Sequence, residues 1–98
     1  MVLVKEPIEF IWDRGNKEKS WVKHEVTDKE CEEVFFDEHK VISKDQFHSK
    51  REKRFILLGE TKRKRLLFVV FTLRGKKVRV ISGRDINRKE RKLYEKAA

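Results

Sequence analysis

The chain has 98 residues, a formal net charge of +9 at pH 7, 44% charged residues and 38% hydrophobic residues. A chain of this length forms one small domain, which we expect to span residues 1–98, and it can bury about 60–65% of its unfolded surface. Its longest apolar run, Leu66–Phe71, has six residues, far short of the roughly 20 that a membrane-spanning helix needs.

Cysteine content and the N-terminal segment indicate the compartment. Cys31 is the single cysteine, so the sequence excludes an internal disulfide and a zinc site made of several cysteines. The segment MVLVKEP has three apolar residues after Met1 and lacks the pattern of a signal peptide. We therefore expect a cytoplasmic protein that does not contact a membrane.

Positive charge is concentrated in the second half of the chain. Residues 50–98 contain 18 Lys and Arg against 5 Asp and Glu, whereas residues 1–49 contain 8 and 12. This asymmetry indicates one basic surface for a polyanionic partner, most commonly a nucleic acid. The alternative is a basic surface that serves solubility alone.

The first predicted elements are a short strand and a helix. Ile8–Trp12 alternates loosely between apolar and polar residues, and Pro7 marks the start of this strand. Asp13 is suited to cap the N-terminus of a helix over Arg14–His24.

A capping box predicts the start of a second helix. The Thr27 hydroxyl can accept a hydrogen bond from the backbone N–H of Glu30, whose side chain can reach back to Thr27. Cys31, Val34 and Phe35 follow at i, i+3, i+4 spacing and form one apolar face of a helix that ends near residue 37. We expect Cys31 to be a small buried core residue rather than a reactive thiol.

Four strands are predicted after the helices. They are Val41–Asp45, Phe55–Gly59, Leu66–Phe71 and Val78–Ser82. The last two are joined by a glycine-containing turn over Arg74–Lys77 and form an antiparallel hairpin. This hairpin is the most apolar part of the chain, so we expect it in the middle of the sheet, with Leu66–Phe71 buried on both faces.

A C-terminal helix completes the predicted fold. Asn87 is suited to cap it in the same way as Thr27, and Leu93 and Tyr94 are expected to face inward. The predicted order is β-α-α-β-β-β-β-α. Four consecutive strands after two helices indicate the α+β class, with an antiparallel sheet of four to five strands.

The sequence contains cations rather than a metal or nucleophile signature. The three histidines are not at ligand spacing, and no CxxC, HxxxH or P-loop is present, so we expect no metal and no cofactor. Arg79 is the most informative cation, because strand alternation places it with Ile81 on one sheet face, opposite Val78 and Val80. That face is either a binding surface or the rim of the core.

These cations suit the cleavage of RNA, which supplies its own nucleophile in the 2′-OH beside each phosphate. A protein need only transfer protons and stabilise the extra charge on the phosphorane, a task suited to arginine. His48 with Glu52 could transfer one proton, and Tyr94 or a cation could transfer the other. Each has a structural alternative: a solvated His48, an ion pair between Glu52 and Arg54, and a Tyr94 that packs in the core.

Several short motifs occur in order along nearly the whole chain, from about Ile8 to Lys96. They are Phe10-Ile11-Trp12-Asp13, Lys23-His24-Glu25-Val26, Glu32–Asp37, His48-Ser49, Glu52-Lys53-Arg54, Val78–Arg84 and Arg88–Glu95. In these motifs the chain resembles the BrnT-type ribonuclease toxins of bacterial type II toxin–antitoxin pairs. Two departures are Glu25, where the family commonly has glycine, and Gly83, where it commonly has alanine.

The resemblance implies a RelE-like fold and a ribonuclease that halts translation. It also implies a BrnA-like antitoxin, which is a dimeric ribbon-helix-helix protein, in a heterotetramer of two toxins and two antitoxins that binds operator DNA through the antitoxin. RelE-like enzymes tend to use Lys, Arg and Tyr rather than a pair of histidines.

We place the site on the sheet face near Arg79 and Arg84. His48, Glu52 and Tyr94 are the candidates for proton transfer, and the predicted RNA-binding residues are Lys23, Arg54, Arg88 and Arg91. This hypothesis requires the guanidinium groups to share one surface. The alternatives are a nucleic-acid-binding co-repressor without catalysis, and a toxin that has decayed into a protein-interaction subunit.

Overall fold

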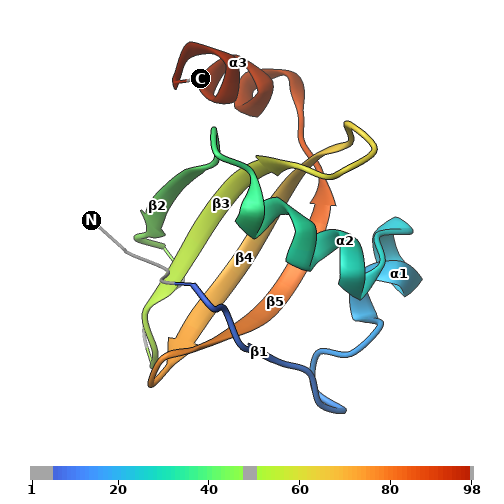
Figure 1. Ribbon diagram of the computed structural model, residues 1–98, viewed down its shortest axis with the longest axis vertical. Helices are drawn as coiled ribbons and strands as arrows, with labels where there is room; N and C mark the ends of the chain where they lie inside the picture. Colours follow the sequence, from blue (N-terminus) through green and yellow to red (C-terminus); the bar gives the residue numbers. More distant parts are fainter. Residues whose placement is uncertain (1–5, 48–50, 98) are drawn as a thin grey trace.

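The computed structural model describes residues 6–47 and 51–97, which form a five-stranded sheet with helices packed against it (Figure 1). The strand order is β1-β5-β4-β3-β2. The strands are β1 (Phe10–Ile11), β2 (Val41–Asp45), β3 (Arg54–Glu60), β4 (Leu66–Arg74) and β5 (Lys77–Asp85). The helices are α1 (Lys19–His24), α2 (Asp28–Glu33), the 3-10 helix η1 (Val34–Phe36) and α3 (Arg88–Ala97). The predicted α+β class and element order are confirmed.

The hairpin of β4 and β5 occupies the middle of the sheet, as predicted. It turns at Gly75, whose φ of +63° is a left-handed conformation that glycine adopts without steric cost. On β4, Leu67, Val69 and Phe71 are each 0% exposed, whereas the intervening side chains are partly exposed. The prediction that this strand is buried on both faces was therefore wrong.

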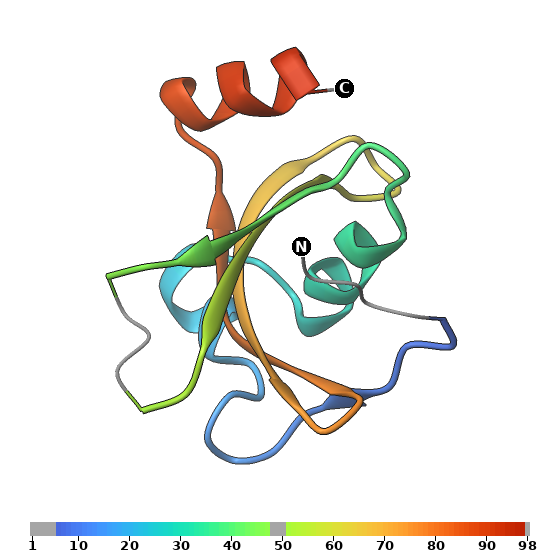
Figure 2. The same cartoon turned by 90° about the vertical axis from the view of Figure 1, so that its left-hand side faces the viewer.

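The reason lies in the placement of the helices. Helix α2 and the residues that follow it lie against one face of the sheet, while α3 lies beyond the ends of the strands (Figures 1 and 2). The core forms between α2, η1 and that one face, where Phe35 makes edge-to-face contacts with Phe10 and Phe71 at ring-centroid distances of 5.2 and 5.0 Å. A sheet with one covered face has alternating burial along its strands.

Helix α2 begins at the predicted capping box. The Thr27 hydroxyl accepts a hydrogen bond from the Glu30 N–H, and the Glu30 carboxylate accepts one from the Thr27 N–H, both at 3.0 Å. Cys31 is 1% exposed, as predicted, and burial raises the pKa of its thiol to about 12. The helical segment ends at Phe36, with Asp37 as its C-terminal cap.

The first helix is shorter than predicted. It begins at Lys19 rather than Arg14, and Asp13 does not cap it. Residues 14–18 instead form a turn anchored by Asn16, whose side-chain amide donates hydrogen bonds of 2.8 Å to the carbonyl oxygens of Ile11 and Val80. These tertiary contacts outweigh the local preference for helix.

Strand β1 pairs with β5 in parallel, whereas the other strand pairs are antiparallel. Only four of the strands therefore match the predicted antiparallel sheet. The segment between β1 and β5 includes α1, α2 and the three strands β2, β3 and β4, and a connection much longer than a hairpin turn permits a parallel neighbour.

Helix α3 presents one residue to the body of the protein where two were predicted. Tyr94 is 8% exposed, but Leu93 is 57% exposed, so the prediction for Leu93 was wrong. Adjacent residues of a helix point about 100° apart, and the narrow contact between α3 and β3 covers one of them. Asn87 caps α3 as predicted, with its carboxamide oxygen 2.8 Å from the Glu90 N–H.

Candidate functional site

A β-bulge in β5 places Arg79 and Arg84 on the same face of the sheet. The two positions are five apart in the sequence, and regular alternation would send their side chains to opposite faces. In the structure Val70 pairs with Ser82 and Phe71 with Val80, so Ile81 is an extra residue in β5. This bulge reverses the alternation, and both arginines point away from the core.

We call this surface the open face. It is the sheet face opposite α2 and η1, and it carries hydroxyl, apolar and cationic side chains. The members used below are Arg54, Ile56, Phe68, Val70, Thr72, Arg79, Ser82 and Arg84. Ile56, Phe68 and Val70 are partly exposed, whereas Thr72 and Leu58 on the same face are buried. The open face can therefore accept a ligand that has both charged and apolar parts.

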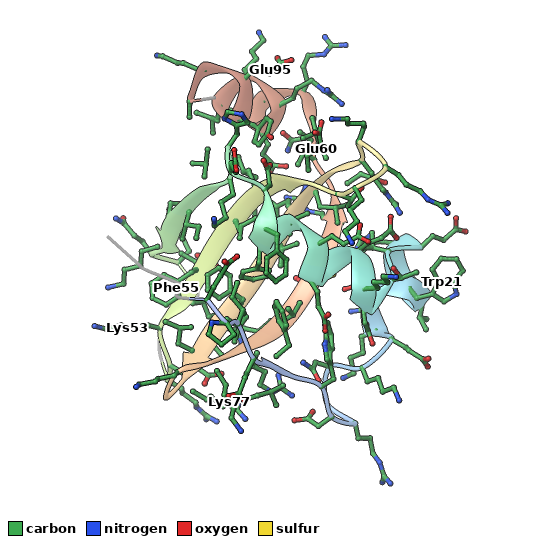
Figure 3. The ribbon with its side chains drawn as sticks, in the orientation of Figure 1. Trp21, Lys53, Phe55, Glu60, Lys77 and Glu95 are labelled. Atoms are coloured by element: carbon green, nitrogen blue, oxygen red, sulfur yellow. The ribbon has the colours of Figure 1, made fainter. Side chains whose placement is uncertain are left out.

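One end of the open face carries a row of three residues on neighbouring strands. Arg54 on β3 pairs with Thr72 on β4, which pairs with Arg79 on β5. Adjacent strands lie about 4.8 Å apart, so the backbones of the two arginines are roughly 10 Å apart. Lys53 and Lys77, labelled in Figure 3, mark this end of the sheet.

Arg79 is held against the turn that follows β1. Its Nη2 donates a 2.8 Å hydrogen bond to Asp13 Oδ1, and its side chain is 14% exposed. This hydrogen bond and one from the Gly15 N–H lower the pKa of Asp13 below its usual value. Arg79 Nε is buried and has no hydrogen-bond partner among the residues that the structure describes.

Arg84 lies at the opposite end of the open face, the end marked by Glu60 in Figure 3. Its two terminal nitrogens donate to the two carboxylate oxygens of Glu90 at 2.9 and 2.8 Å, and its guanidinium carbon lies 3.9 Å from the centre of the Phe68 ring. The bond to Glu90 raises the pKa of Arg84 despite burial. Along β4 the Arg84 row, at Phe68, is four residue steps from the Arg79 row, at Thr72, a distance of roughly 13 Å.

The candidates for proton transfer lie at different places. Glu52 precedes β3 and pairs with Arg74 Nε at 3.7 Å, near the Arg79 end. His48 lies outside the described residues. Tyr94 lies near the other end, where its hydroxyl donates a 2.6 Å hydrogen bond to Asp37 Oδ2. Burial and Asp37 raise the pKa of Tyr94, which makes it a poor proton donor at neutral pH.

The remaining predicted RNA-binding residues belong to three elements, α1, β3 and α3, and all are at least partly exposed. Lys23 belongs to α1, which lies along the edge of β5, where the Ser20 hydroxyl accepts a 2.8 Å hydrogen bond from the Gly83 N–H. Arg88 and Arg91 are exposed on α3, next to the Arg84 end. Arg54 lies on the open face itself.

Sequence reasoning missed the carboxylates that hold the two central arginines. Asp13 was predicted to cap a helix, and Glu90 was considered only as part of the Arg88–Glu95 motif, because neither has a regular spacing from its arginine. The sequence also gave no indication of the bulge at Ile81. A β-bulge leaves a trace in the residues only when it requires glycine, and this one does not.

The described residues contain no group of three or more His, Cys, Asp or Glu side chains arranged to hold a metal ion. The chemistry available on the open face is that of guanidinium groups. These groups are suited to bind phosphate oxygens, because their planar forks can donate two parallel hydrogen bonds.

Comparison with known families assigns the chain. The family model described as "Ribonuclease toxin, BrnT, of type II toxin-antitoxin system" matches residues 12–90. The chain belongs to the BrnT family. Its members are ribonuclease toxins of type II toxin–antitoxin systems, so the family implies an RNA substrate and an antitoxin partner. No curated protein matches the chain.

The BrnT match includes both rows of the open face. It extends over Asp13, Arg54, Arg79, Arg84 and Glu90, and it ends before Arg91 and Tyr94. Within the described residues, no helix is both long enough and apolar enough to cross a membrane.

Proposed function

We propose that this BrnT-family chain is a cytoplasmic endoribonuclease that works without a metal ion and stops translation by cutting RNA. Its partner is a BrnA-like ribbon-helix-helix antitoxin, in an assembly of two toxins and two antitoxins that binds operator DNA through the antitoxin. The single domain of residues 1–98 performs the chemistry.

The proposed reaction is an internal displacement on RNA. The 2′-oxygen of one nucleotide attacks the adjacent phosphorus, the bond to the 5′-oxygen breaks, and a 2′,3′-cyclic phosphate and a 5′-hydroxyl result. One protein group accepts the proton of the 2′-OH and another donates a proton to the leaving 5′-oxygen. Cations stabilise the additional negative charge on the phosphorane.

Arg79 and Arg84 are the proposed stabilisers of that charge, and Arg54, Lys23, Arg88 and Arg91 contact the RNA backbone. One proton transfer is assigned to His48 with Glu52, and Glu52 lies near the Arg79 end, where it pairs with Arg74. The other proton transfer was left to Tyr94 or a cation; the bond of Tyr94 to Asp37 favours the cation, with Tyr94 positioning α3.

The observation that supports this proposal is the bulge in β5. It brings Arg79 and Arg84 onto one partly exposed face together with Arg54. A face with guanidinium groups at both ends and the apolar side chains of Val70 and Ile56 between them suits a single RNA strand, whose phosphates are anionic and whose bases are largely apolar.

The test is cleavage of a labelled RNA by the purified protein in the presence of EDTA. We expect cleavage with a 2′,3′-cyclic phosphate end, and no cleavage of the 2′-O-methyl form of the same RNA. Arg79→Ala and Arg84→Ala should each lower the rate at least 100-fold while the folded state survives. Arg63→Ala removes the same charge from an exposed turn and serves as the matched control. Full activity in both open-face variants would place the site elsewhere.

A second candidate function is nucleic-acid binding without catalysis, as a co-repressor with the antitoxin. It is favoured by the pairing of Arg79 with Asp13 and of Arg84 with Glu90, because guanidinium groups already held by carboxylates resemble a structural network. Intact RNA in the same assay, together with binding that weakens steeply with salt, would support this function over cleavage.

A further inference from the structure

The Arg79 guanidinium, which the proposed function assigns to an RNA phosphate, already binds a carboxylate of the same chain. Asp13 Oδ1 lies 2.8 Å from Arg79 Nη2. The Asp13 side chain is 47% exposed and the Arg79 side chain is 14% exposed, so the carboxylate lies between the arginine and solvent. Carboxylate and phosphate oxygens accept the same charge-assisted hydrogen bonds from arginine.

The turn that carries Asp13 is well ordered by its own contacts. The Gly15 N–H donates to Asp13 Oδ1 at 2.8 Å, and the Asp13 N–H donates to Asn16 Oδ1 at 2.7 Å. Gly15 packs directly against the arginine, because a Cβ at this position would lie 2.6 Å from Arg79 Nη2. The turn therefore covers the guanidinium rather than merely approaching it.

The pair leaves one hydrogen-bond donor of the arginine unused. Nε and Nη2 form the same edge of the guanidinium, and an oxyanion with two oxygens can accept from both. Of these two guanidinium donors, only Nη2 donates a hydrogen bond to Asp13. Nε is buried and has no partner among the described residues. A phosphate could satisfy both donors, but only after the Asp13 turn has moved away.

We infer that Asp13 is an internal competitor of the RNA phosphate at Arg79, so that Asp13 must leave the guanidinium before this end of the open face binds its substrate. The inference rests on the proposed function and adds to it a residue that sets RNA affinity. In the free protein Asp13 holds Arg79 in place, and in the complex a phosphate replaces it.

The test is the affinity of the full chain for a fluorescent 2′-O-methyl RNA, which lacks the attacking hydroxyl and stays intact. Asp13→Asn keeps the oxygen that accepts from the Gly15 N–H but removes the charge. We expect this variant to bind about two- to fivefold more tightly, the range corresponding to the loss of a partly exposed ion pair. Asp13→Ser, whose hydroxyl can accept the same hydrogen bond, is the second variant if the first does not fold.

Two controls separate local competition from overall charge. Glu9→Gln removes the same charge from the pair of Glu9 with Lys77, close to the same end of the sheet, and should tighten binding less. In the Arg79→Gln variant, Asp13→Asn should no longer tighten RNA binding, because the ion pair between residues 13 and 79 is already absent.

Unchanged or weaker binding by Asp13→Asn would overturn the inference, and so would an equal gain from Glu9→Gln or a gain that persists in Arg79→Gln. If the wild-type protein binds the probe and Arg79→Gln weakens that binding, any of these outcomes would overturn only the role of Asp13 and leave the proposed RNA site in place. Absence of binding by the wild-type protein at low salt would instead overturn the proposed RNA site, and the inference with it.

Discussion

At the scale of single residues, three described residues other than glycine hold the left-handed backbone conformation: Glu18, Glu25 and Lys64. Glu25 ends α1 with a φ of 55° and a ψ of 36°, and its N–H donates a 2.9 Å hydrogen bond to the Trp21 carbonyl oxygen. This is the position at which the sequence resemblance predicts glycine. The chain therefore keeps the C-terminal cap geometry without the residue that adopts it most readily.

We expect Glu25→Gly to raise the free energy of unfolding by about 0.5–1 kcal/mol, because the removal of steric strain exceeds the added entropy of the unfolded chain. Urea denaturation measures the change. The matched control is Glu38→Gly, the same exchange at an exposed residue outside the left-handed region. The explanation by backbone strain would be wrong if both exchanges had the same effect.

At the scale of elements, α2 packs so closely on β5 that residue 83 has no room for a side chain. A Cβ on Gly83 would lie 2.6 Å from Cys31 Sγ, whereas the next nearest atoms, on Val26 and Val69, are 3.6 Å away. The glycine on the strand and the cysteine on the helix therefore form a size-matched pair.

Gly83→Ala should lower the free energy of unfolding by about 1–3 kcal/mol through overpacking. Adding Cys31→Ala removes the atom that the new methyl group meets, so the double variant should be more stable than the sum of the two single changes predicts. A double-mutant cycle by urea denaturation measures this coupling, which we expect to be about 0.5–3 kcal/mol. Purely additive effects would show that α2 can shift away from β5 at little cost.

Helix α3 is attached to the rest of the protein by a small number of polar contacts. One is the bond of the Tyr94 hydroxyl to Asp37, and another is the pair of Glu90 with Arg84. Asp37 also accepts a 2.8 Å hydrogen bond from the Glu60 N–H, so this carboxylate joins α3 to the end of β3.

Tyr94→Phe should lower the free energy of unfolding by about 1.5–3 kcal/mol, because it removes a hydrogen bond to a charged group. We expect the RNA cleavage rate per folded molecule to change less than about threefold, since the hydroxyl is already committed to Asp37. A loss of 100-fold or more would assign Tyr94 to proton transfer after all.

At the scale of the whole molecule, ion pairs link elements that are far apart in the chain. Arg65, which precedes β4, bonds to Asp85 at 2.7 Å, to Glu30 at 3.2 Å and to the Glu25 carbonyl oxygen at 3.0 Å. The bond to Asp85 is the largest cause of the raised pKa of Arg65. One arginine therefore joins α1, α2 and β5.

Stability should fall in acid. The pKa values of Asp37, Asp85, Glu30 and Glu90 are lowered from about 3.8 for Asp and 4.5 for Glu. Burial opposes these shifts, but hydrogen bonds and arginines outweigh it. The unfolded chain then binds more protons at low pH, so the stabilisation is complete above about pH 5 and is lost as the pH falls through the folded-state values. Urea midpoints from pH 7 to pH 3 measure this, and Asp85→Asn should flatten the curve. A midpoint that stays constant down to pH 3 would contradict it.

Much of the fold could be predicted because its signals are local. The capping box at Thr27, the helical spacing of Cys31 and Val34, and the apolar strand at Leu66 each depend on residues a few positions apart. The start of α1 could not be predicted in this way, because it depends on the hydrogen bond from Asn16 to Val80, which is distant in the sequence. The exposure of Leu93 could not be predicted either, because α3 contacts only a small part of the sheet.

The candidate site, like the fold, could be predicted only in part from the sequence. The sequence determined by itself that the chain is basic in its second half and that arginines lie within and beside the last strand. Whether Arg79 and Arg84 share a surface was decided by the tertiary structure alone. Pairing with β4 leaves Ile81 as an extra residue, and the register between two strands depends on contacts that no short stretch of sequence contains.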